Sequence, residues 1–194
     1  VFKTGEYISI YEEGLLKIYD SLGQLKEEID ITLGERLIKG NNRYIYIGET
    51  LKGILHIYDY NGEYVKSIQF EGPIYNLKLF GDSYIGIALE DNTLFLFDAQ
   101  GEEVTKLEIP QGEVTDFQLS GNGQVLGVSV LNITDFDYNS NIFLYSLGGR
   151  IHLGKKVDKG IIYYLQAVDE DKIMAIGANK YIILAKDDGI VFER

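Results

Sequence analysis

Five times along this chain, a short run of alternating apolar residues is followed after a brief gap by a glycine. The runs are Leu16–Asp20, Leu55–Asp59, Leu94–Asp98, Ile142–Ser146 and Ile182–Lys186, and the glycines are Gly23, Gly62, Gly101, Gly149 and Gly189. The glycines lie 39, 39, 48 and 40 residues apart. A repeat of about 40 residues that is built from short strands is typical of stacked four-stranded units. This spacing constrains the fold more than any other feature of the sequence.

The third repeat shows the strand pattern most clearly. Pro73–Phe80, Tyr84–Leu89, Thr93–Asp98 and Glu103–Ile109 carry alternating apolar residues, and short polar turns separate them. Runs of this length with period-two patterning predict antiparallel strands. Because no window has the spacing of an amphipathic helix, we expect an all-β chain with essentially no helix.

The remaining repeats align with the third and divide the whole chain. We expect one domain over residues 1–194, with units at about residues 1–31, 32–71, 72–110, 111–158 and 159–194. Phe2–Ile8 aligns with Leu79–Ile85. Residues 1–4 are therefore predicted to be the end of a first strand whose beginning is missing.

Three of the predicted third strands end in an aromatic residue followed by aspartate: Tyr19-Asp20, Tyr58-Asp59 and Phe97-Asp98. Gly121-Asn122-Gly123 lies between two predicted strands. With these features the chain resembles the β-propellers of the WD-repeat and bacterial quinoprotein-like (YVTN-type) superfamilies, in which a Trp-Asp pair ends the third strand of a blade. The Gly-His dipeptide of WD repeats is absent, and the last two units lack the aromatic-Asp pair. The resemblance therefore implies a WD-like bacterial propeller and not a eukaryotic WD protein.

The resemblance implies a β-propeller of about five four-stranded antiparallel blades. A propeller protects the edges of its blades by closing them into a ring. Two arrangements are open: a five-bladed ring, or a run of blades from a larger ring.

Composition narrows the classes of partner. The net charge is −12, so nucleic acid and anionic membrane surfaces are poor candidates, since binding them requires clustered Lys and Arg. A basic protein, a cationic ligand or a divalent cation fits this charge better. The absence of cysteine excludes disulfides and thiolate chemistry, and no apolar run is long enough to span a membrane. We expect no cofactor.

In propellers of the resembled families, the first strand of each blade lines the central channel. The polar positions that this implies here are Arg36, Asn76, Lys78, Asp116, Gln118, Tyr164 and Gln166. Such residues form either a solvated channel wall or a site for a small ligand. Both interpretations stay open from the sequence.

The 48-residue interval contains an insertion, Asn132–Ser140, which we expect to be a polar loop between the second and third strands. Acidic and amide residues alternate there in the pattern of a calcium loop, at Asp135, Asp137, Asn139 and Asn141. The match is partial because Ser140 and Ser146 replace the expected glycine and glutamate. These four residues are therefore weak metal candidates, and an exposed polar loop is the alternative. Phe136 and Tyr138 are candidate contact residues at the tip.

The turns between second and third strands, and the links between blades, should lie on one face of the propeller. Acidic residues dominate these segments: Glu12, Glu13, Glu49, Glu71, Glu90, Asp91, Glu113, Asp135, Asp137 and Asp158. Only Lys52, Lys159 and Lys180 oppose them. We predict an acidic rim that is either solvated or a docking face for a basic protein. The residues proposed for partner contact are Glu12, Glu13, Glu90, Asp91, Phe136 and Tyr138.

Catalytic residues are not evident in the sequence. His56 and His152 lie in strands of different blades, and Asp116 is the one clear inward carboxylate, whereas glycoside hydrolysis needs a pair. We expect a non-catalytic scaffold for protein–protein interaction, within a larger extracytoplasmic or membrane-associated bacterial protein. The alternatives are a carbohydrate-active hydrolase or lyase, and a propeller that senses a ligand or Ca²⁺ at the channel mouth.

Overall fold

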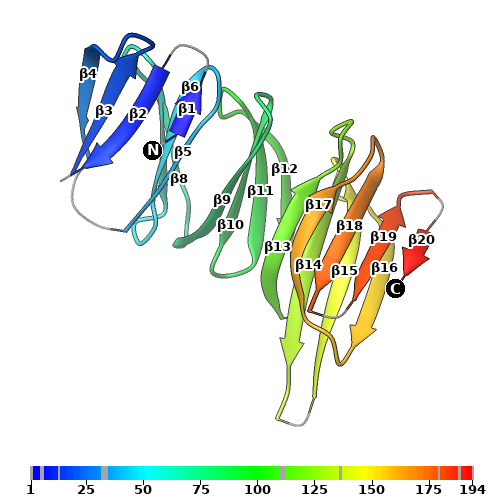
Figure 1. Cartoon of the computed structure of the whole chain (residues 1–194). Coiled ribbons are helices and arrows are strands. Elements are labelled where there is room, and N and C mark those ends of the chain that lie inside the picture. Colours follow the sequence, from blue (N-terminus) through cyan, green and yellow to red (C-terminus); the bar gives the residue numbers. More distant parts are fainter. Residues whose placement is uncertain are drawn as a thin grey trace. The chain divides into compact units, whose positions relative to one another are not determined.

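Each predicted repeat folds into a four-stranded antiparallel sheet whose strands pair in sequence order (Figure 1). The computed structural model describes residues 2–4, 7–12, 14–31, 35–109, 112–135, 137–178, 180–187 and 189–193, with only the backbone described up to residue 12. These residues contain five such sheets and no helix. The prediction of an all-β fold with five four-stranded units is confirmed. No helix in the described residues is long and apolar enough to cross a membrane.

The chain divides into two compact units, residues 1–104 and 105–194, each described here by itself. The strands of the first three sheets are β1 (Phe2–Thr4), β2 (Tyr7–Glu12), β3 (Leu15–Asp20), β4 (Leu25–Asp30), β5 (Arg36–Gly40), β6 (Tyr44–Glu49), β7 (Ile54–Asp59), β8 (Tyr64–Gln69), β9 (Ile74–Phe80), β10 (Tyr84–Leu89), β11 (Thr93–Asp98) and β12 (Glu103–Glu108). Those of the last two are β13 (Glu113–Leu119), β14 (Val125–Ile133), β15 (Tyr138–Ser146), β16 (Ile151–Asp158), β17 (Ile162–Ala167), β18 (Lys172–Gly177), β19 (Tyr181–Ala185) and β20 (Gly189–Glu193).

The aromatic-Asp pairs close the turns between third and fourth strands. In each of the first three blades, one Oδ1 of the aspartate accepts the backbone amides two and four residues later, at 2.8–2.9 Å; the aspartates are Asp20, Asp59 and Asp98. The glycine three residues on has φ between 77° and 83°, a conformation that glycine adopts without strain. In these three blades the spaced glycines therefore mark a repeated aspartate-capped turn.

Apolar clusters hold neighbouring blades together within each unit. Leu16 and Ile18 of β3 share a buried cluster with Ile45 and Ile47 of β6. The same arrangement recurs between the second and third blades and between the fourth and fifth. The first strands of neighbouring blades lie side by side, β1 by β5, β5 by β9, and β13 by β17, as the inner strands of a propeller do.

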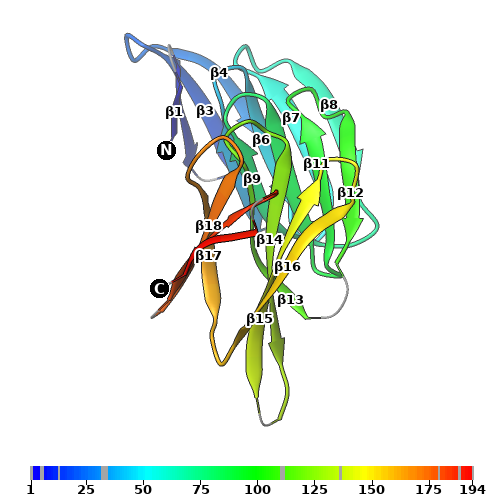
Figure 2. The same ribbon diagram turned by 90° about the vertical axis from the view of Figure 1, so that its right-hand side faces the viewer.

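The insertion in the fourth blade forms a longer hairpin, so the prediction of a polar loop over Asn132–Ser140 was wrong. β14 and β15 continue to pair through Asn132–Asn139 and Ile133–Tyr138. A tight turn follows, in which the amide of Thr134 donates to the carbonyl of Asp137 at 2.9 Å. Of the alternating residues, Asn139 and Asn141 belong to β15, where residues two apart share a face, whereas Asp135 and Asp137 lie in the turn. The hairpin reaches beyond the ends of the other strands of its sheet (Figures 1 and 2).

Candidate functional site: the rim of the blades

In each unit, the turn between the second and third strands lies beside a link between blades. The amide of Ile74, at the start of β9, donates to the carbonyl of Thr50, after β6, at 2.8 Å. In the second unit, the amide of Lys159 donates to the carbonyl of Tyr138 at 3.1 Å. These segments therefore form a rim at one end of the strands in each unit, as the antiparallel order requires.

The rim of the first unit contains a cavity of about 450 Å³ between the second and third blades. Leu51 and Tyr75 line it, although they are 73% and 49% exposed to solvent. The exposed carboxylates of Glu35 and Glu90 line it as well. An aromatic ring, an exposed leucine and two carboxylates together suit a side chain with an apolar stem and a cationic head, such as Lys or Arg.

A nearly buried ion pair lies at the edge of this cavity. Arg36 of β5 and Glu49 of β6 are directly opposite each other, with side chains only 5% and 11% exposed. Arg36 Nη1 lies 3.2 Å from Glu49 Oε2. The same carboxylate contacts Lys52 Nζ at 2.8 Å and His56 Nε2 at 3.0 Å. One carboxylate therefore links two strands and the turn between β6 and β7.

The hydrogen bond from Lys52 is the main cause that holds the pKa of Glu49 below its ordinary value. Burial opposes this effect, while His56 and Arg36 reinforce it. Glu49 is therefore ionised at neutral pH and is shared by two cations, Arg36 and Lys52, so this network keeps one positive charge. Glu35 and Glu90 bring two negative charges to the lining of the cavity.

The sequence alone did not reveal this network. In the third blade the equivalent pair is Ile74 and Leu89, both nearly fully buried. A charged pair thus replaces an apolar pair at one blade. The signal lies in the pairing of the first two strands of this blade, which places Arg36 opposite Glu49. The sequence prediction assigned Arg36 to a channel wall and did not pair it with Glu49.

Two acidic residues predicted for the rim are in this site: Glu90 lines the cavity, whereas Glu49 is buried in the ion pair and not exposed at the rim. Asp91 is exposed, and its Oδ1 accepts the amide of Thr93 at 2.9 Å, so it also shapes the turn. The side chain of Glu12, and Glu13 as a whole, lie outside the described residues. Sequence reasoning missed Glu35, because nothing in its local pattern distinguishes it from other surface acids.

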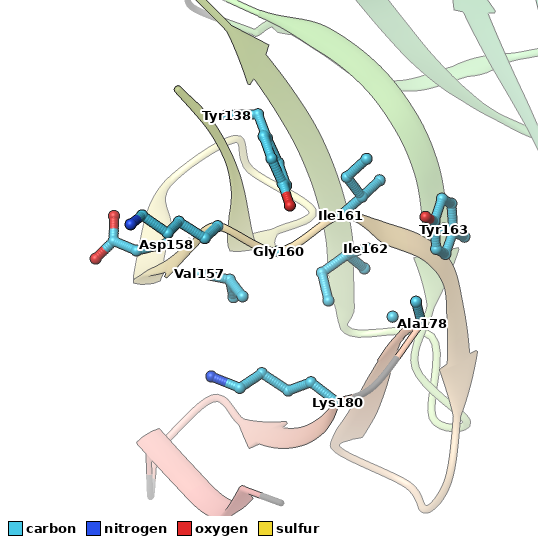
Figure 3. Close-up of a pocket in the computed structure, with 11 residues that line it drawn as sticks. Tyr138, Val157, Asp158, Gly160, Ile161, Ile162, Tyr163, Ala178 and Lys180 are labelled. Carbon is cyan, nitrogen blue, oxygen red and sulfur yellow. The ribbon is translucent and has the colours of Figure 1, made fainter. Parts of the chain in front are cut away.

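A second cavity, of about 270 Å³, lies at the rim of the second unit. The rings of Tyr138 and Tyr163 lie on opposite sides of it, and the apolar side chains of Val157 and Ile162 lie between them (Figure 3). Lys180 lies along the open side (Figure 3). The predicted contact residue Tyr138 thus forms a cavity wall.

Charged groups around the second cavity pair with one another. Lys180 Nζ lies 2.8 Å from Glu193 Oε1, and Lys156 Nζ lies 2.7 Å from Asp158 Oδ1. These partners lower the pKa of Glu193 and of Asp158. The apolar walls are therefore the main feature of this cavity.

The hairpin tip carries apolar side chains past the rest of the fourth blade. Residues two apart on β15 share a face, so Tyr138 lies on the face of Ser140 and Ile142, which are fully buried against the fifth blade. Tyr138 and its cross-strand partner Ile133 are 43% and 70% exposed. The face of β15 that packs on the fifth blade therefore continues, with apolar side chains, past the part that the fifth blade covers. Phe136, the other predicted contact residue, lies outside the described residues.

The predicted channel residues lie on first strands, at the inner edges of their sheets. Asp116 is 4% exposed, and its Oδ2 accepts the amide of Leu165 at 2.7 Å. This carboxylate therefore joins the first strands of the fourth and fifth blades. Of the others, the side chains on β9 and β13 are partly buried and those on β17 are exposed; they are Asn76, Lys78, Gln118, Tyr164 and Gln166.

The weak metal candidates are divided between the hairpin turn and a strand. Asp135 and Asp137 flank the turn, while Asn139 and Asn141 belong to β15. Asp137 Oδ1 accepts the amide of Tyr138 at 2.9 Å. Among the described residues, no group of three or more His, Cys, Asp or Glu side chains could hold a metal ion. The calcium hypothesis stays a prediction.

A family model with the description "Family of unknown function (DUF5711)" matches residues 1–193. No curated protein matches the chain. The family match extends over all five sheets.

Solved structures resemble the chain in fold. Two are of Hsv2, a β-propeller protein of Kluyveromyces lactis: KlHsv2 with loop 6CD replaced by a Gly-Ser linker has a TM-score of 0.72 at 12% identity, and Hsv2p has 0.66 at 12%. Hydrazine synthase of Kuenenia stuttgartiensis has 0.67 at 13%. The matches cover 100%, 100% and 96% of this chain but 65%, 70% and 61% of those chains, respectively. The likeness to Hsv2 identifies the five sheets as part of a β-propeller.

Proposed function

We propose that this chain, which belongs to the family of unknown function DUF5711, is a non-catalytic β-propeller segment that binds a basic protein partner. The observation that carries the proposal is the rim cavity of the first unit, where Glu35 and Glu90 surround Tyr75 and Leu51. The net charge of −12 creates a negative field, which attracts a basic partner and favours their encounter.

In this proposal, a Lys or Arg side chain of the partner enters the cavity. Its cationic head pairs with Glu35 or Glu90, and its stem or guanidinium plane packs on the ring of Tyr75. Leu51, which is largely exposed in the free chain, adds apolar contact. Rim charges of this kind mainly increase the association rate, while the buried anchor sets the lifetime of the complex.

The hairpin of the second unit is a separate contact surface in this proposal. Ile133 and Tyr138 offer exposed apolar area beside the 270 Å³ cavity. Aromatic residues that keep one side exposed are common anchors in protein interfaces.

We further propose that the propeller is of the WD-like, YVTN-type bacterial kind. The repeated aromatic-Asp turns support this assignment, as does the strand order within each blade. The place we propose for it is a larger extracytoplasmic or membrane-associated protein. Fractionation of the source cells, followed by detection of the protein, tests that location.

Site-specific photo-crosslinking tests the binding role of the rim. The chain contains no cysteine, so Leu51→Cys can carry a photoreactive label at a single site. Leu22→Cys is the matched control, since Leu22 is 80% exposed but lies on a turn between third and fourth strands, at the other end of the blades. We expect a basic protein partner to crosslink to the label at position 51 and not to the label at position 22. Equal crosslinking from both positions would remove the support for a rim site.

A second candidate function, hydrolysis of a carbohydrate, is favoured by one observation. Glu35 and Glu90 line the same cavity, and glycoside hydrolases act through paired carboxylates. If this were the function, Glu35→Gln or Glu90→Gln would abolish turnover of a glycoside. The binding proposal expects no turnover in the unmodified protein at all.

A further inference from the structure

The fifth blade presents an apolar face that the described residues of its unit leave uncovered. One face of this sheet packs on the fourth blade through Ile173, Ala175, Ile182 and Leu184, all fully buried. The opposite face carries apolar and aromatic side chains over β18, β19 and β20, at Met174, Ile176, Tyr181, Ile183 and Phe192, and Gln166 and Lys172 border them. These residues are partly or largely exposed, and Phe192 is 43% exposed.

The side chains on this face are arranged as a continuous surface. Ile183 of β19 lies opposite Met174 of β18 on one side and Phe192 of β20 on the other. The rings of Tyr181 and Phe192 stack, with centroids 5.4 Å apart and planes 19° apart. A soluble surface seldom leaves a contiguous patch of this composition unused.

The earlier blades indicate what covers such a face. The corresponding third-strand residues of the first, second and fourth blades are fully buried in a cluster with the following blade: Leu16 and Ile18, Leu55 and Ile57, Ile142 and Leu144. In the fifth blade the strand register puts Tyr181 and Ile183 at these positions, one residue earlier than the alignment of the glycines does. Ile183 pairs with Phe192 just before a register shift, as Leu144 pairs with Leu153 in the fourth blade. The last face thus has the chemistry of an inter-blade face without a following blade.

We infer that a further four-stranded blade, from polypeptide outside residues 1–194, packs on this face. The blades that cover the earlier faces do so with branched apolar residues on their second strands, such as Ile45 and Ile47, or Ile85 and Ile87. The occupant should carry the same pattern. The solved propellers named above also extend beyond the part that this chain matches.

Oxidation of methionine tests this inference on the unmodified protein. Met174 is the only methionine of residues 1–194 and lies on the face in question. In the natural polypeptide that contains these residues, we expect hydrogen peroxide to oxidise Met174 at least about tenfold more slowly than in the denatured chain, because a packed blade excludes the oxidant. Oxidation at the denatured rate overturns the inference.

Cysteine labelling provides the second measurement and identifies the source of the cover. In the same natural polypeptide, Ile183→Cys should react with a maleimide at least about tenfold more slowly than Leu22→Cys, which is 80% exposed on a turn of the first blade. The protection should be independent of concentration. If the protection of Ile183→Cys disappears on dilution and light scattering shows a dimer, a second copy of the chain covers this face. That result contradicts the inference of a further blade.

Discussion

Arg36 and Glu49 lie in an environment that differs from that of their counterparts in the third blade. Where the third blade has Ile74 and Leu89, the second has an ion pair with side chains that are almost completely buried. Burying two charges costs free energy that their attraction only partly offsets. An ion pair at this position is therefore better explained by the properties of the cavity beside it than by stability.

A double-mutant comparison tests this explanation. Glu49→Gln leaves the Arg36 cation buried without a carboxylate, so we expect it to reduce the free energy of unfolding by about 3 kcal/mol. The double variant Arg36→Ile/Glu49→Leu recreates the apolar pair of the third blade and should be within about 1 kcal/mol of the unmodified protein. Urea denaturation measures both. A double variant as unstable as Glu49→Gln would mean that the ion pair itself holds the blade together.

Glu49 also predicts a dependence of stability on pH. Its pKa is lowered in the folded state, chiefly by Lys52, so the unfolded chain binds this proton more readily. The stabilisation is therefore complete above the ordinary value of 4.5 and disappears as the pH falls through the lower folded value. Urea denaturation between pH 7 and pH 3 should show a steeper loss in the unmodified protein than in Glu49→Gln. Parallel curves for the two proteins would contradict this assignment.

At the scale of the strands and turns, most of the fold follows from local pattern. Period-two alternation predicted β10 and β11 at their observed bounds, and the aromatic-Asp pairs located the turns that aspartate oxygens close. The extension of β14 and β15 into the insertion was missed because its paired residues are polar on one face, Asn132 and Asn139, and exposed on the other, Ile133 and Tyr138, a pattern that strands and loops share.

The candidate site was only partly predictable for a related reason. Alternation shows which face of a strand is buried but not which residue lies opposite it on another strand. Asp116 was therefore assigned to a channel wall, whereas it is buried and bound to the backbone of the next blade. Glu90 was predicted at the rim, but its place in one cavity with Glu35 and Leu51 depends on the packing of two blades.

Asp116 gives a prediction at this scale. Asp116→Leu leaves the amide of Leu165 buried without an acceptor, so we expect a loss of about 2 kcal/mol in the free energy of unfolding. Asp116→Asn keeps a carbonyl acceptor at nearly the same place and should cost less than half as much. Thermal denaturation of the two variants measures the difference. Equal losses, or none, would show that the bond between β13 and β17 does not stabilise the pair of blades.

At the scale of the whole molecule, charge and repetition together favour a binding platform. Within each unit, the packed blades support the rim, which places turn residues of neighbouring blades side by side. The net charge of −12 makes repulsion of polyanions and attraction of basic partners the dominant long-range effect. Both effects should weaken as salt screens the exposed charges.

Binding of a basic peptide to the rim of the first unit is the most direct test of this function. The measurement is the Kd of a fluorescent lysine- and arginine-rich peptide, determined by anisotropy at low salt. It is made on the unmodified chain, on the cavity variant Glu35→Gln/Glu90→Gln, and on the control variant Glu28→Gln/Glu63→Gln. The control removes two exposed carboxylates away from the cavity. We expect the cavity variant to bind at least about tenfold more weakly, equivalent to about 1.4 kcal/mol, and the control to change the Kd by less than about twofold. If peptide binding weakens equally in the two variants, the effect comes from net charge alone, and this result would contradict a binding site at this cavity.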